Sequence, residues 1–280
     1  MEYSTWEEAV SWLMAQPDKQ EIVRDCYYDL PLKATADRYW HSPEWQAIKK
    51  FFPSQPGYAL DLGAGNGIAS YALAKEGWQV QALEPDPSNL VGCGAIRQLV
   101  GETELTIEVV QGIGEDLPFE NRTFNLVFCR QALHHARHLQ SLCTEIHRVL
   151  KPRGVLVAVR EHVISSQRDL PKFLESHPLH NLYGGENAYR LKEYLGALKL
   201  AGLQVEQVIG PFDSVINYAP LTEKYIKDEL KKRFNRIPGG MIVSQLVLGD
   251  RFFKPFLQVL SKIDQRPGRL FSFICYKLED

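Results

Sequence analysis

Short apolar runs recur along the chain from residue 58 onward, and longer amphipathic stretches separate them. The runs are rich in aliphatic and aromatic residues and are about as long as ordinary strands. Such runs are typical of strands that are buried on both faces of a parallel sheet. The five that we predict as parallel strands are Tyr58–Leu62, Val80–Leu83, Leu105–Val110, Phe124–Phe128 and Val155–Val159.

The stretches between these runs have helical periodicity. The clearest example runs from Leu139 to Leu150, where apolar residues share one helix face, and it stops at the breaker Lys151–Gly154. Consecutive parallel strands need a long crossover, which a helix supplies. The alternation therefore predicts an α/β fold, doubly wound, with helices on both faces of a mostly parallel sheet.

Two more strands follow in the second half of the chain. A helix with Leu191, Leu195 and Leu198 on one face stops near Gly202, and the strand-like run Leu203–Ile209 comes next. The last candidate strand is Leu270–Leu278. The sheet is thus expected to have seven strands.

Two helical segments fall outside this alternation. Residues 1–56 predict a helical N-terminal cap that ends at a Pro- and Gly-containing turn, and residues 211–268 predict a helical insertion before the last strand. The core would then span 57–210, with its final strand at 269–280. Aromatic residues in both segments are expected either to line an acceptor pocket or to form plain core: Tyr39, Trp40, Tyr218, Phe252 and Phe253.

Composition narrows the class of protein. The chain has 280 residues and is 45% hydrophobic, which is enough for a full core, and 32 basic residues nearly balance 34 acidic ones. The near balance makes nucleic acid an unexpected partner. Five scattered cysteines, an N-terminus without a secretory pattern and the lack of a long apolar run lead us to expect a soluble, cytoplasmic protein without a membrane span.

The most informative stretch is Ala59–Ser70, in which a buried strand enters a turn with glycines at 63, 65 and 67 before an amphipathic helix. Glycine lacks a Cβ, so this backbone can take positive φ and approach a ligand closely. Glu84 follows Asp61 by 23 residues, at the end of the next strand, where a carboxylate can accept both hydroxyls of a ribose. The pattern predicts a nucleoside site.

An acid next to the glycine turn helps to choose the nucleoside. In a dinucleotide site this helix N-terminus faces a pyrophosphate, so Asp61 would be unfavourable there. S-adenosylmethionine has an ammonium group and no phosphate, and an acid suits it. A nicotinamide-dependent oxidoreductase is therefore a less favoured interpretation of this site.

Several motifs together resemble the class I small-molecule methyltransferases over about residues 57–160. They are the D-L-G-x-G-x-G turn from Asp61, Glu84-Pro85, Glu115–Phe119, Phe124–Phe128 and Ala132–His135. The resemblance implies S-adenosylmethionine as the cofactor. It also implies a Rossmann-like sheet whose last strand, Leu270–Leu278, inserts antiparallel beside the fifth-to-sixth edge.

The resemblance also implies roles for individual residues. Asp61, Gly63 and Gly65 would hold the methionine part of the cofactor, Glu84 the ribose, Ile113 and Gly114 the adenine, and Cys129 would lie near the methionine amine. The expected cofactor-binding set is Asp61, Gly63, Ala64, Gly65, Gly67, Glu84, Pro85, Ile113, Gly114 and Cys129. The chain has Ile113 where the family often has an acid, and Asn125 where it often has Asp, so adenine recognition is the weakest part of the likeness.

Candidate catalytic residues follow the strands, because ligands of open parallel sheets bind outside the carboxyl ends of the strands. We expect Arg130 and Gln131 after the fourth strand, and Arg160, Glu161 and His162 after the fifth. His162 is the first candidate for a general base, since an unperturbed histidine accepts a proton near neutral pH. A purely structural His162, bonded to loop backbone, is the competing interpretation.

His135 is the second catalytic candidate, although a histidine of this segment more often orients the loop or opens the next helix. His162, His177, His180 and Glu186 share one polar segment. We expect no metal there, because solvated loop histidines are common. The neighbouring Leu182–Tyr189 segment is expected either to close over the acceptor as a lid or to cap a helix that starts near Asn187.

The expected function is S-adenosylmethionine-dependent methylation of a small or medium-sized metabolite, at oxygen. The N-P-P-Y type of segment that amino-group methylation of nucleobases uses is not in the sequence. An alternative from another class is a methyltransferase-fold protein that binds the cofactor as a sensor or assembly partner. The sequence leaves the acceptor and the oligomeric state open.

Overall fold

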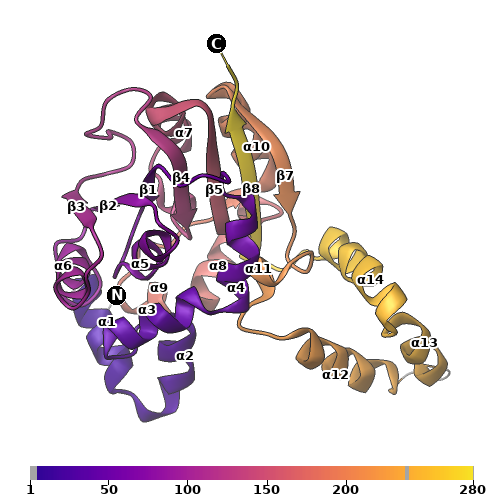
Figure 1. The fold of residues 1–280 in the computed structure, drawn as a ribbon. Helices are drawn as coiled ribbons and strands as arrows, with labels where there is room; N and C mark the ends of the chain where they lie inside the picture. The colour runs from indigo at the N-terminus through magenta and orange to yellow at the C-terminus, as the bar shows by residue number, and fades with distance from the viewer. Residues whose placement is uncertain (1–4, 237–239, 280) are drawn as a thin grey trace.

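One twisted sheet forms the centre of the protein (Figure 1). The structure, a computed structural model, describes residues 5–236 and 240–279. Seven strands lie in the order β3-β2-β1-β4-β5-β8-β7, and β6 pairs with β5 off this path. The strands are β1 (Tyr58–Leu62), β2 (Gln79–Glu84), β3 (Ile107–Gln111), β4 (Phe124–Arg130), β5 (Leu150–Ile164), β6 (Tyr189–Arg190), β7 (Leu203–Ile209) and β8 (Arg269–Lys277).

The sheet is parallel except at β8. This last strand of the chain inserts between β5 and β7 and runs antiparallel to both. The mostly parallel α/β architecture that the sequence predicts is therefore confirmed, including the antiparallel final strand. Parallel order from β3 to β5 places the carboxyl ends of β1, β2 and β4 at one edge, which is where the glycine turn and Glu84 lie.

Strand β5 is longer than the predicted Val155–Val159. A bulge between Ala158 and Glu161 interrupts its pairing with β8, and Arg160 takes a φ of +62° there. Pairing then resumes, with His162 opposite Leu270. The expectation that Arg160, Glu161 and His162 follow the strand was therefore wrong, because the bulge lets β5 continue to Ile164.

A second difference concerns the predicted lid segment. Tyr189 and Arg190 form β6, which pairs parallel with Val163 and Ile164 of β5, so the sheet has eight strands and not the expected seven. The next helix begins at Leu191 rather than near Asn187. The polar segment after β5 also holds three short helices, η4 (Gln167–Asp169), α8 (Leu170–Ser176) and α9 (Pro178–Leu182).

Two apolar cores lie on the two faces of the sheet, as alternation along β1 illustrates. Ala59 packs into one core, whereas Leu60 and Leu62 pack into the other. The first core includes residues of α3 (Leu32–Trp40), α4 (Pro43–Ile48), α5 (Ile68–Lys75) and α6 (Cys93–Gly101). The second includes residues of α7 (Leu139–Val149), which the sequence predicted, and α10 (Leu191–Leu200).

Of the N-terminal helices, α3 and α4 belong to the core on one face of the sheet. Trp45 of α4 is fully buried, and its ring lies 5.8 Å from that of Phe128 in β4. Thr5 caps the first helix by accepting from the Glu8 N–H. The other elements of this region are α1 (Trp6–Ala15), η1 (Pro17–Lys19), α2 (Gln20–Asp25) and η2 (Lys49–Phe51). The burial of α4 makes this helix part of the domain's core, whereas residues of α1 and α2 cluster with α9.

The segment between β7 and β8 is helical. It comprises α11 (Val215–Tyr218), α12 (Glu223–Phe234), α13 (Gly240–Val247) and α14 (Asp250–Ile263), and α12 to α14 lie beyond the β7 edge of the sheet (Figure 1). Tyr218, Ile226, Phe253 and Leu257 form a small core of their own. No helix in the described parts of the chain is long and apolar enough to cross a membrane. The structure does not describe residues 1–4, 237–239 and 280. They belong to the predicted segments 1–56, 211–268 and 269–280, respectively.

Candidate active site

The glycine turn after β1 has the backbone conformation that only glycine adopts readily. Gly63, Gly65 and Gly67 have φ values of +74°, +56° and +87°. A Cβ at Gly63 would lie 2.8 Å from the Cβ of Ala132, whereas a Cβ at Gly65 would meet no atom within 4 Å. Gly65 therefore faces open space, and its lack of a side chain leaves room for a ligand.

Glu84, the last residue of β2, is tied to this turn. One carboxylate oxygen accepts the N–H of Gly65 at 2.8 Å, and the other accepts the N–H of Asp86 at 3.0 Å. Burial raises the pKa of Glu84 to about 7, although both backbone bonds act in the opposite direction. Each oxygen still has lone-pair capacity for a ligand hydroxyl.

Asp61 lies inside the sheet beneath the turn. It is buried and accepts the hydroxyl of Ser70 at 2.5 Å, and burial raises its pKa to about 6. The Ser70 bond joins β1 to α5, which begins immediately after the turn. Asp61 therefore shapes the turn and also contributes negative potential to the cavity, whose lining it joins.

A cavity of about 1370 Å³ opens at this edge of the sheet. That exceeds the roughly 300–1,000 Å³ of a typical ligand pocket, so it has room for a nucleoside and a second molecule. Of the predicted cofactor residues and catalytic histidines, those on its lining are Asp61, Gly63, Ala64, Gly65, Glu84, Pro85, Ile113, Gly114 and His135. Gly67, Cys129 and His162 are not among its lining residues.

Ile113 and Gly114 give the cavity lining an apolar stretch where the adenine is expected. The side chain of Ile113 is exposed, and a Cβ added at Gly114 would lie 2.5 Å from the Cδ1 of Leu142. Glu115 also lines the cavity, but its carboxylate accepts the backbone N–H groups of Arg137 and His138. Glu115 thus holds the start of α7 in place.

The opposite end of the cavity has a buried ion pair. Arg130 donates to Glu44 at 2.8 Å and 3.3 Å, and Arg160 lies 3.8 Å from the same carboxylate. Burial opposes ionisation of Glu44, but the two guanidinium groups outweigh it and hold its pKa below the usual range. Two arginines thus share one buried carboxylate beside the cavity.

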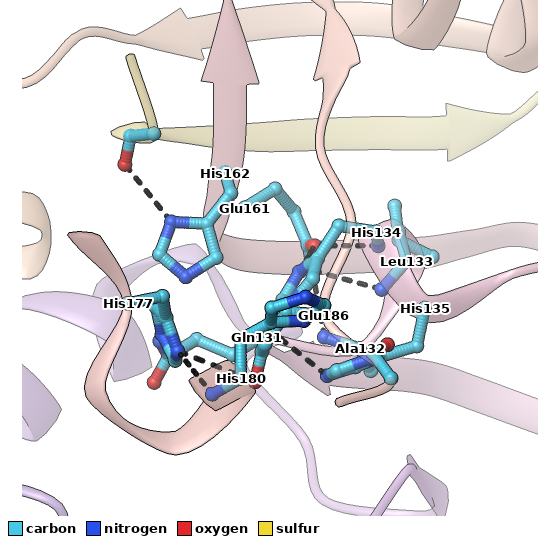
Figure 2. Close-up of polar contacts among 12 residues, drawn as sticks. Gln131, Ala132, Leu133, His134, His135, Glu161, His162, His177, His180 and Glu186 are labelled. Carbon is cyan, nitrogen blue, oxygen red and sulfur yellow. Dashed lines mark hydrogen bonds and ion pairs between the residues drawn. The ribbon is translucent and has the colours of Figure 1, made fainter. Parts of the chain in front are cut away.

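Glu161 organises the loop after β4. Its carboxylate accepts the backbone N–H groups of Ala132, Leu133 and His134 at 3.0–3.1 Å, and the ring Nδ1 of His134 lies 2.7 Å away (Figure 2). Glu161 is completely buried. The loop with His134 and His135 is consequently locked to β5.

Several histidines and Glu186 gather beside this loop (Figure 2). Burial disfavours a charged His134, but its hydrogen bond with Glu161 and its ion pair with Glu186 raise its pKa to about 9. The histidine neighbours lower the pKa of Glu186 to about 2 against the effect of burial. Burial lowers the pKa of His162 to about 3, and its Nδ1 lies 2.9 Å from the carbonyl of Gly268.

The two predicted catalytic histidines occupy different places. His162 is buried within β5 and packs against Phe173. His135 lines the cavity with its side chain 45% exposed, and its Nδ1 lies 3.1 Å from the carbonyl of Gly185. His135 is thus the one that a ligand in the cavity can reach.

Sequence reasoning missed several residues of the site. Glu44 comes from α4, and Trp6 and Tyr28 line the cavity from the N-terminal region. These residues precede the glycine turn and belong to no recognisable motif. Glu186 was noted only as one member of a polar segment, although this segment supplies Tyr183, Gly184 and Gly185 to the cavity as well.

Comparison with known proteins agrees with the geometry. Residues 60–158 match the family model described as a methyltransferase domain. An uncharacterized methyltransferase of Synechocystis sp. is 39% identical over 105 residues, which are 37% of this chain and 46% of that protein. The chain therefore aligns with less than half the length of that relative. A ubiquinone biosynthesis O-methyltransferase of Pseudomonas syringae pv. tomato is 26% identical over 76% of this chain and 92% of its own length.

A solved structure has the same fold. Phosphoethanolamine N-methyltransferase 2 of Haemonchus contortus, determined with S-adenosylhomocysteine and phosphomonomethylethanolamine, superposes with a TM-score of 0.56 at 17% identity. The superposition covers 95% of this chain and 59% of the other. At this level of identity the likeness shows the fold alone.

Proposed function

We propose that this chain, a class I S-adenosylmethionine-dependent methyltransferase, transfers a methyl group to an oxygen of a small or medium-sized metabolite. One observation supports this most directly. The nucleoside features, Gly65 and Glu84, and a set of polar side chains lie along a single continuous cavity. Cofactor and acceptor can therefore meet inside it.

The two ends of the cavity would bind different molecules, the cofactor at one end and the acceptor at the other. Glu84 would accept the ribose hydroxyls, and the uncovered backbone at Gly65 would let the cofactor approach β1 closely. At the other end, Arg130 and Gln131 offer N–H groups to the acceptor. Alignment of two bound molecules removes the entropy of their encounter, which is the main task in methyl transfer.

Bound S-adenosylmethionine supplies an electrophilic methyl group, so the chain needs chiefly to orient the acceptor and to accept its proton. His135 is placed for the second task. It lines the cavity, and because the carbonyl of Gly185 can only accept, its Nδ1 holds the hydrogen and its Nε2 has a free lone pair. A hydroxyl acceptor benefits from such a base, whereas a neutral amine does not require one.

Labelled methyl transfer tests the proposal. The purified protein would be incubated with methyl-labelled S-adenosylmethionine and a size-matched panel of phenols, hydroxy acids and primary amines. We expect label on hydroxyl compounds, and we expect His135→Gln to lower kcat by about 100-fold or more without changing the affinity for S-adenosylhomocysteine. NADH serves as the control ligand and should leave the melting temperature unchanged.

The outcomes separate the alternatives. A melting temperature that S-adenosylhomocysteine does not raise would overturn the cofactor site, since a ligand of the folded state must stabilise it. Binding without transfer to any class of acceptor would instead favour a protein that holds the cofactor as a sensor. Label on amines alone would overturn the assignment to oxygen.

A further inference from the structure

Three potential metal ligands converge beside the cavity from three different segments (Figure 2). His134 comes from η3 (Leu133–His135), His162 from β5, and Glu186 from the segment before β6. One ligand atom of each lies within 4.8 Å of the other two. His134 and Glu186 also line the cavity, so the cluster borders the space assigned to the acceptor.

The hydrogen bonds of the two histidines fix which nitrogen is available. The Nδ1 of His134 lies 2.7 Å from the carboxylate of Glu161, and the Nδ1 of His162 lies 2.9 Å from the carbonyl of Gly268. Both partners are acceptors, so each Nδ1 holds a hydrogen and each Nε2 is left to face the cluster. A metal ion there would displace the additional proton of His134. Metal-binding histidines show this arrangement, in which a carboxylate or carbonyl orients the ring from behind.

Glu186 supplies a buried oxygen whose ion pairs, with His134 at 3.4 Å and His135 at 4.0 Å, are long. Its side chain is only 9% exposed, and its Oε2 is buried without a hydrogen bond from any residue that the structure describes. The Nε2 of His134 forms an ion pair with this oxygen and does not hydrogen-bond to it. Buried carboxylate oxygens are costly unless a donor or a cation compensates them.

We propose that His134 Nε2, His162 Nε2 and the carboxylate of Glu186 bind a divalent transition-metal ion of the zinc type. Two histidines and one carboxylate are a ligand set that such ions use, with nitrogen distances of about 2.0–2.1 Å. These distances place neighbouring tetrahedral ligands about 3.3 Å apart, close to the 3.4 Å between His134 and Glu186. His162 must approach slightly to complete the site.

The ion would have two effects. It would fasten the segment with Glu186 onto β5 and the loop after β4, because its ligands come from all three. Three protein ligands also leave a coordination position, and an acceptor oxygen in the neighbouring cavity could occupy it. The second effect rests on the proposed function, whereas binding of the ion does not.

Direct metal titration tests the site. Metal-free protein would be titrated with Zn²⁺ against a chromophoric chelator, and we expect one ion per chain at the highest affinity. Glu186→Gln and His162→Gln should each weaken that binding more than the roughly 10–100-fold typical of changes behind a metal ligand. Glu175→Gln and His41→Gln remove the same groups from exposed positions and should leave it unchanged.

Cobalt provides a second measurement on the same variants. Co²⁺ in the site should give the visible d–d absorption of a four-coordinate ion, which Glu186→Gln abolishes while its thermal unfolding stays cooperative. Loss of Zn²⁺ binding in the two ligand variants but not in the two controls supports the site. Lack of tight binding in the parent protein, or equal binding in all variants, would overturn it. His134 would then be an ion-paired side chain only. This result does not depend on the outcome of the methyl-transfer assay.

Discussion

The backbone N–H of Gly65 donates to the carboxylate of Glu84 at 2.8 Å, so the turn after β1 and the end of β2 hold each other in place before any ligand arrives. This bond and the one from the Asp86 N–H use one lone pair on each oxygen and leave one on each available. A ribose can therefore bind without rearrangement of the carboxylate, and pre-organisation of this kind lowers the entropy lost on binding.

The raised pKa of Glu84 predicts pH-dependent cofactor affinity. Ribose hydroxyls donate to the ionised carboxylate and thus favour it, whereas a pKa of about 7 leaves the group largely protonated below that pH. We expect the affinity for S-adenosylhomocysteine to fall by up to about tenfold per pH unit below pH 7. Calorimetric titrations from pH 5.5 to 8 measure this, with Glu84→Gln as a control that binds weakly at every pH.

The stability of the ligand-free protein should depend on pH with the opposite sign. The folded-state pKa of Glu84 lies above its ordinary value of 4.5, so its contribution to the free energy of unfolding is present below pH 4.5 and is lost as the pH rises toward 7. The pKa of Asp61 is likewise raised, from 3.8 to about 6, so its contribution is lost as the pH rises over that range. A cofactor affinity that is flat across this range would contradict the assignment of Glu84 to the ribose.

Gly65→Val should abolish binding of S-adenosylhomocysteine, because the side chain would enter the open space next to Glu84. The positive φ adds a penalty of roughly 1–2 kcal/mol to the folded state for a residue with a Cβ. Gly196→Ala is the matched control, since its Cβ also meets no atom within 4 Å but lies in α10. It should raise the free energy of unfolding by about 0.5–1 kcal/mol and leave ligand affinity unchanged. Wild-type affinity in a folded Gly65→Val protein would refute the turn's role.

Local patterns were enough to predict the parallel strands and the glycine turn. Each depends on residues adjacent in sequence, so periodicity and the spacing from Asp61 to Glu84 located them. The end of β5 was not predictable in this way. It depends on a bulge at Arg160 and on pairing with β8, more than one hundred residues later. Polar residues such as Glu161 and His162 look like a loop until that partner is known.

The same limit applies to the site. Gly65 and Glu84 belong to a motif, and the sequence identified both. Glu44 pairs with Arg130 at the cavity only because α4 packs against β4. Glu186 reaches His134 because β6 attaches its segment to β5. Contacts of this kind arise from tertiary packing, for which a single sequence has no local signal.

Trp45→Ala should destabilise the whole domain, because Trp45 joins the N-terminal helices to the sheet. Its fully buried ring packs against Phe128 and Phe52. Loss of a large buried aromatic ring should lower the free energy of unfolding by about 3–5 kcal/mol. Urea unfolding measures the change, and Leu200→Ala, at a 79% exposed position, should stay within about 0.5 kcal/mol of the parent. Equal effects of the two substitutions would show that the N-terminal region is not part of the core.

Glu44→Gln should be strongly destabilising, since it leaves the buried guanidinium groups of Arg130 and Arg160 without their shared anion. Breaking a buried pair in this way lowers the free energy of unfolding by about 3–5 kcal/mol. Glu229→Gln breaks an exposed pair with Lys232 and should have no measurable effect. Because Arg130 and Arg160 hold the pKa of Glu44 below its ordinary 4.5, the stabilisation is present above pH 4.5 and is lost as the pH falls through the lower folded-state value. The difference in free energy of unfolding between parent and variant, measured by urea unfolding, should therefore become smaller in acid. A difference that stays constant from pH 7 to pH 3 would mean that the charge of the carboxylate does not stabilise this end of the cavity.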